Sequence, residues 1–153
     1  MINILIGQIY IYLKHVINFN STSSNEDKDK KRVFSILVDP LYKIYKNHNF
    51  TPIIIYYAGK CLEGLLWSDI DLPNAEKLFN NKILETIENY IVNVDSKIQL
   101  SSVMIFNHII PAFKDNLSEE LNKHNKIFQT LMEDILCGPT IPGVSHSAKV
   151  LNI

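Results

Sequence analysis

A repeated pattern, in which a polar break precedes an apolar stripe, spans residues 74–137 and constrains the fold more than any other feature. After the break at Asn80-Asn81, apolar residues recur at helical spacing from Ile83 onward, and a second stripe starts at Ile127. Ile83 and Ile127 hold equivalent places 44 residues apart, and Leu41 lies 42 residues before Ile83. Apolar residues at this spacing indicate amphipathic helices. The chain is therefore predicted to be all-α and built from repeating helical units.

The length of the repeat is typical of helical solenoids. A helix-rich period of roughly 40–47 residues belongs to armadillo and HEAT arrays. We predict one armadillo-like α-solenoid region over residues 1–153, with about two and a half to three repeats and incomplete repeats at both ends. Gly59 and Gly64 lie inside a helical run although glycine is a poor helix former. They are predicted where two helices approach closely, as stacked repeats require. A glycine-rich phosphate-binding loop is the rival interpretation, but the spacing of these glycines matches no nucleotide-binding fingerprint.

Local signals predict where several helices begin and end. Asp39-Pro40 resembles a helix start, so the stripe around it is predicted to break into two helices there. Thr51-Pro52 repeats this signal, and Asp95-Ser96 is predicted to cap a helix that Pro111 stops. Asn80-Asn81 is predicted to close a helix in the left-handed conformation. Residues 113–125 are predicted to form a polar connector.

Composition bounds the classes of function. The chain has 153 residues, about one domain, and a net charge of −1 from 15 basic and 16 acidic residues. This balance argues against a nucleic-acid binder that works through bulk charge, which needs a clustered basic surplus. The two cysteines, Cys61 and Cys137, make neither a disulfide framework nor a metal cage. They are predicted to be buried thiols in a reducing, cytoplasmic setting.

The first residues of the chain are apolar and the next are polar. Residues 1–19 lack an early basic residue, and Lys14-His15 interrupt their apolar run. The segment therefore fits neither a signal peptide nor a membrane span, and it is predicted to be a packing helix whose preceding partner is missing. Residues 20–31 are of low complexity and are predicted to form a flexible polar loop.

A search for catalytic or metal-binding groups gives little. Ser101-Ser102 and His108 could be a nucleophile and its base, but seven residues along one helix span about 10 Å, beyond hydrogen-bond reach. We expect no enzyme activity, no cofactor and no metal. A small all-α enzyme or nucleic-acid-processing bundle stays open as an alternative function. A pocket that holds Arg32 with two histidines would favour it. None of the histidines has metal-ligand spacing: His15, His48, His108, His124 and His146.

Several segments resemble a known family. Four runs are similar to the armadillo-repeat exchange factor and chaperone family called SmgGDS: residues 74–79 (which follow 65–69), 97–102, 124–133 and 144–148. The resemblance covers roughly residues 33–153, and the Asn- and Ile-rich composition is similar to that of the family's amoebal relatives. The chain departs from the family pattern where Pro40, Asn81 and Lys126 replace glycines at the breaks, and at His108 and Pro111.

The resemblance implies a non-catalytic protein that binds small GTPases of the Ras and Rho classes in the cytoplasm, without membrane insertion. Such proteins engage the basic, prenylated tail of the GTPase, and they promote nucleotide release or act as chaperones. In the family, an Asn on the groove-lining helix binds the main chain of a partner. Alignment places His108 at that position beside Asn107, and Glu85 and Glu88 could supply acidity for the tail. The alternative is a generic armadillo-type adaptor with another protein partner.

Overall fold

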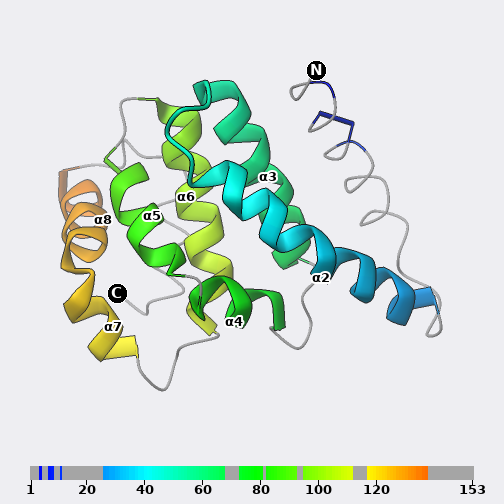
Figure 1. Cartoon of the computed structure of the whole chain (residues 1–153). Helices are drawn as coiled ribbons and strands as arrows, with labels where there is room; N and C mark the ends of the chain where they lie inside the picture. The colour runs from blue at the N-terminus through cyan, green and yellow to red at the C-terminus, as the bar shows by residue number, and fades with distance from the viewer. Residues whose placement is uncertain are drawn as a thin grey trace.

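The computed structural model describes residues 26–67, 73–80, 82–92, 95–111 and 117–137, together with Ile4, Gly7, Gln8 and Ile11. All regular structure in these residues is helical, as predicted (Figure 1). The helices are α2 (Glu26–Tyr45), α3 (Pro52–Trp67), α4 (Pro73–Asn80), α5 (Ile83–Tyr90), α6 (Ser96–Ile109), α7 (Leu117–Lys123) and α8 (Asn125–Cys137). No helix in this described part is both long and apolar enough to cross a membrane.

Helix α2 continues through Pro40, so the predicted break at Asp39-Pro40 is wrong. A proline inside a helix removes the hydrogen bond to the carbonyl four residues earlier, which here belongs to Ile36. Pro40 is exposed and Ile36 is 65% exposed, so water can reach this side of the helix. The opposite side is anchored in the core by Val38, Leu41 and Tyr45. Burial along that side holds the helix together where a hydrogen bond is missing.

The beginning of α2 also differs from expectation. The helix begins at Glu26, within the segment 20–31 that was predicted to be a polar loop, and residues 20–25 lie outside the described residues. Acidic residues are favourable at a helix N-terminus because they face its partial positive charge, and the sequence starts this helix with Glu26-Asp27. The polar composition therefore suits the start of a helix as well as a loop.

The predicted starts of α3 and α6 are confirmed. Thr51 precedes α3, and its carbonyl accepts hydrogen bonds from the N–H groups of Ile54 and Ile55 at 2.9 and 3.2 Å. Pro52 is the first residue of that helix, where its missing N–H costs nothing. Asp95 caps α6, since its side chain accepts from the backbone N–H groups of Lys97 and Ile98. Helix α6 ends at Ile109, before Pro111, as predicted.

The structure adds detail to two connections. Helix α4 ends at Asn80, and Lys82, which precedes α5, is left-handed with a φ of 63°; Asn81 lies outside the described residues, so its predicted conformation stays a prediction. Helix α7 occupies much of the predicted polar connector 113–125. In this helix Lys123 forms ion pairs at 2.9 Å with Glu119 and with Glu120, which are one turn away. Such pairs support a short polar helix that has little apolar surface to bury.

Helix α6 lies at the centre of the arrangement. It packs against α3 on one side and α5 on the other, and α8 packs on α5 (Figure 1). The core includes apolar side chains from six of the helices, α2 to α6 and α8. The three residues that hold equivalent places in the sequence pattern are all buried: Leu41, Ile83 and Ile127.

Gly59 lies where α3 approaches its neighbours closely, as its position in the sequence predicts. A Cβ atom added to this glycine would lie 2.8 Å from Cε2 of Tyr45 on α2. It would also lie 2.9 Å from both Cβ and Oγ of Ser101 on α6. Only a residue without a side chain fits between these helices, because real Cβ atoms do not approach other atoms so closely.

Other predictions lie wholly or partly outside the described residues. The apolar segment 1–19 is described only at four separate positions, so its packing role stays a prediction. The same holds for the burial of Cys137 and for the incomplete repeats at the two ends. Cys61 is fully buried, as expected. Burial raises the pKa of its thiol to about 12, so the side chain behaves as an inert apolar group.

Candidate functional site

The candidate partner-binding residues lie on two adjacent helices. Asn107 and His108 are in the last turns of α6, and Glu85 and Glu88 are on α5, which packs against α6. The Asp95 cap fixes where α6 begins. The regular rotation of the helix then sets the direction in which Asn107 and His108 point. Although α5 and α6 are in contact, the carboxylates of Glu85 and Glu88 make no hydrogen bond to the Asn107 amide within the described part of the chain.

Asn107 is the most unusual of these residues. It is only 6% exposed, and both Oδ1 and Nδ2 of its amide are buried without a hydrogen-bond partner among the residues that the structure describes. A buried polar group left unpaired costs about 1–3 kcal/mol, and native structures contain few of them. An amide offers one acceptor and two donors, which is what a site for the main chain of an extended segment requires.

His108 is less buried than Asn107, although its Nε2 atom lies beneath the surface. The alignment that placed His108 at the position of the binding amide therefore selects the more exposed of the two neighbours. The structure shows only that Asn107 is the more buried of the two neighbours. Consecutive residues on a helix point in different directions, so their burial depends on what packs around the helix and does not follow from sequence spacing.

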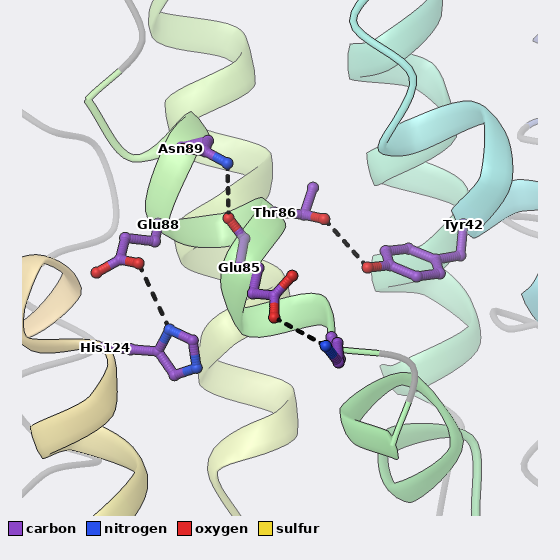
Figure 2. Close-up of polar contacts among 7 residues, drawn as sticks. Tyr42, Glu85, Thr86, Glu88, Asn89 and His124 are labelled. Carbon is purple, nitrogen blue, oxygen red and sulfur yellow. Dashed lines mark hydrogen bonds and ion pairs between the residues drawn. The ribbon is translucent and has the colours of Figure 1, made fainter.

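Glu85 lies on the exposed side of α5. Its carboxylate is 3.5 Å from Nζ of Lys82, and the two side chains are 58% and 75% exposed (Figure 2). The backbone carbonyl of Glu85 accepts a hydrogen bond from Nδ2 of Asn89 at 2.9 Å. An ion pair as exposed as this contributes little to stability. The carboxylate therefore can exchange Lys82 for a cation of a partner at little cost.

Glu88 has a more protected partner. Its Oε2 atom is 3.5 Å from Nδ1 of His124, and the two side chains are only 22% and 17% exposed (Figure 2). His124 lies between α7 and α8, so this contact links α5 to the last described helices. Glu88 therefore serves the packing of helices, and Glu85 is the better placed of the two to meet a partner.

A set of buried hydroxyl groups, not anticipated from the sequence, joins α2 to α5 and α6. Ser102 Oγ donates to the carbonyl of Ile98 at 2.8 Å, and the Tyr45 hydroxyl lies 2.7 Å from the same Oγ. Because Ser102 has a single hydroxyl proton, Tyr45 is the donor of this second bond. Tyr90 in turn donates to the backbone carbonyl of Tyr45 at 2.7 Å, satisfying a carbonyl at the end of α2.

The same layer includes a bond between the hydroxyls of Tyr42 and Thr86 at 3.1 Å (Figure 2). Burial raises the pKa of Tyr42 and Tyr45 above the usual range, and it raises the pKa of Tyr90 to about 12. These phenols therefore stay neutral hydrogen-bonding groups at physiological pH. The signal that could have found them is their separation of 44 or 45 residues, close to the repeat period.

The serines considered as nucleophiles are structural. Ser101 and Ser102 are fully buried, and each donates its hydroxyl proton to the carbonyl of Ile98. A nucleophile needs a base that takes that proton and a path for substrate. Among the described residues no three His, Cys, Asp or Glu side chains are grouped so that they could hold a metal ion.

Comparison with known proteins adds no relative. No family model, curated protein or solved structure matches the chain.

Proposed function

We propose that this chain is an armadillo-like array that binds small GTPases through their basic, prenylated tails in the cytoplasm, without catalysis of its own. The repeat is supported by the sequence separation between residues that contact one another from different helices, which is close to the repeat period. Lys77 donates to the Ser35 carbonyl across 42 residues, and the Tyr42–Thr86 and Tyr90–Tyr45 bonds span 44 and 45 residues. In a solenoid each unit contacts its neighbour one period away.

The order of the helices supports the same division. Helices α2–α3, α4–α6 and α7–α8 are taken as successive units. The last helices of the first two units, α3 and α6, pack on one another. The helices α5 and α8 also pack together, and each follows a short helix at the start of its unit. On this division α3 with α6, and α5 with α8, would be equivalent helices in contact, as expected of stacked repeats that bury a continuous core.

The proposed site combines two kinds of group. Asn107 holds a donor and an acceptor that are unused among the described residues, and they would reach the main chain of the partner once binding displaces the side chains that cover them. Glu85 offers a carboxylate whose present ion pair is exposed and easily replaced by Lys or Arg of a basic tail. His108 and Glu88 flank them on the same two helices. Neither Asn107 nor Glu85 is asked to carry out a chemical reaction on the GTPase. Nucleotide release or chaperoning would therefore follow from binding alone.

Pull-downs with the purified chain would test this proposal against a panel of small GTPases, prenylated and unprenylated, nucleotide-free and nucleotide-loaded. We expect selective capture that falls with added salt, with removal of the basic tail, and with the Glu85→Gln substitution. Glu119→Gln on α7 is a matched control, because that carboxylate is also exposed and also paired with a neighbouring lysine. Asn107→Leu should weaken capture without lowering stability, since it removes an unpaired buried amide.

Absence of capture from a folded, monodisperse sample would contradict the GTPase proposal and leave the chain as an armadillo-type adaptor with another partner. Equal loss of capture with Glu119→Gln would also contradict it, because the contact would then depend on net charge alone.

A further inference from the structure

The C-terminal half of α2 carries a hollow that has no part in the site proposed above. Its volume is about 210 Å³, and it is lined by Asp39, Tyr42, Lys43 and Lys46. These positions are spaced by three, four and seven residues from Asp39, so they share one face of the helix. The hollow therefore combines one carboxylate, one aromatic ring and two ammonium groups.

Among the described residues that line this hollow, two ammonium groups face one carboxylate, and the Glu85 carboxylate nearby is paired with Lys82. Asp39 is paired with Nζ of Lys77 at 2.9 Å. Lys43 and Lys46 are exposed and, within the part of the chain that the structure describes, neither forms an ion pair. The chain as a whole has a net charge of −1, so this surplus of positive charge is local. Basic residues are favourable at a helix C-terminus because they face its partial negative charge. Both lysines nevertheless remain exposed to solvent.

Tyr42 gives the hollow a fixed wall. It is only 4% exposed, and its hydroxyl is held by Thr86. Nζ of Lys46 lies 5.1 Å from the centroid of its ring, in a cation–π contact. Tyr42 thus holds the Lys46 ammonium in place at the edge of the hollow.

We propose that this hollow docks an aspartate or glutamate side chain of a protein partner. A carboxylate carries a single negative charge that Lys43 and Lys46 can share. A phosphate group fits less well, because the hollow lies near the carbonyl end of α2, where partial negative charge opposes a dianion. The Asp39 carboxylate on the same face opposes it further. This docking does not depend on the partner being a GTPase.

The test is fluorescence anisotropy of a fluorescein-labelled oligoglutamate peptide with the intact chain at low ionic strength. The test variant is Lys43→Gln with Lys46→Gln, which keeps the side-chain length and removes both charges. The control variant is Lys97→Gln with Lys126→Gln, which removes two other exposed lysines that form no ion pair among the described residues. Circular dichroism melts would establish that both variants are folded.

We expect the test variant to bind the peptide about fivefold more weakly than the wild type, because two exposed ion pairs are lost. The control variant should bind within about twofold of the wild type, and inorganic phosphate should compete poorly. Equal weakening by the two variants would overturn the proposal, since attraction would then follow net charge. Full competition by phosphate at the concentration of the peptide's carboxylates, or no binding by the wild type, would overturn it as well.

Discussion

Replacing Gly59 by alanine tests the close packing at the centre of this structure. The new methyl group would lie 2.8 Å from Cε2 of Tyr45 and 2.9 Å from Cβ and Oγ of Ser101. Neither neighbour can move easily. Tyr45 is fully buried, is hydrogen-bonded to Ser102, and packs edge-on against the Tyr90 ring. The Cβ atom of Ser101 is attached directly to the backbone of α6, so relief requires α3 and α6 to separate.

Two opposing effects set the size of the change. Alanine is about 1 kcal/mol more favourable than glycine inside a helix. Overpacking a core by one methyl group costs about 1–3 kcal/mol, and three contacts below 3.0 Å against fixed atoms place Gly59 in the upper part of that range. We therefore expect Gly59→Ala to lower the free energy of unfolding by about 1–2 kcal/mol. For a chain of this length the melting temperature should fall by roughly 2–8 °C.

Urea denaturation followed by circular dichroism would measure the change, with a double-mutant cycle as its control. Ser101→Gly removes two of the three close atoms. In that background Gly59→Ala should cost at least about 1 kcal/mol less than in the wild type, because residues in contact are not additive. If Gly59→Ala instead raises stability by about 1 kcal/mol, as at an uncrowded helix position, the reasoning is refuted.

Three further predictions follow from the same core and its edges. Ser102→Ala should lower the free energy of unfolding by about 1–3 kcal/mol, because the buried Tyr45 hydroxyl loses its acceptor. Tyr45→Phe removes that hydroxyl and should cost about 1 kcal/mol less. Chemical denaturation of both variants measures the difference. Lys82→Gly should raise the melting temperature, since a left-handed non-glycine residue costs about 1 kcal/mol or more; an unchanged or lower value would contradict the strain. In a Cys137→Ser background, Cys61 should react with a disulfide reagent at pH 8 at least about a hundredfold more slowly than in urea.

The raised pKa values also predict alkaline unfolding. The Cys61 thiol and the Tyr90 phenol each have a pKa of about 12 in the folded chain, above their ordinary values of 9.0 and 10.0. As the pH rises, the unfolded chain loses these protons first, so the folded chain binds more protons and its stability falls. Stability should therefore be steady below about pH 9 and decline between about pH 9 and pH 12. Cys61→Ala should remove the earliest part of this decline, and a profile unchanged by the substitution would contradict the assignment.

Much of the local structure follows from the sequence alone. Helix starts at Pro52 and at Ser96 depend on capping residues adjacent in the chain, and the apolar stripes fix which side of each helix is buried. Gly59 could be recognised as a close-packing position because a glycine inside a helix needs a reason. The candidate site residues were named from the sequence, and the structure places them on two adjacent helices. The sequence could not decide between Asn107 and His108, since their burial depends on what packs on α6.

Tertiary structure decided everything that required two distant segments to meet. The sequence around Pro40 predicts a break, yet burial of Val38, Leu41 and Tyr45 against other helices keeps α2 continuous. The partners of Tyr42 lie 44 residues away, and no local rule can assign them. Capping and periodicity act within one or two turns, so the sequence determines them directly. Core hydrogen bonds, the buried amide and the lysine-lined hollow arise only when the helices pack, because packing alone determines which polar groups lose water and which gain a partner.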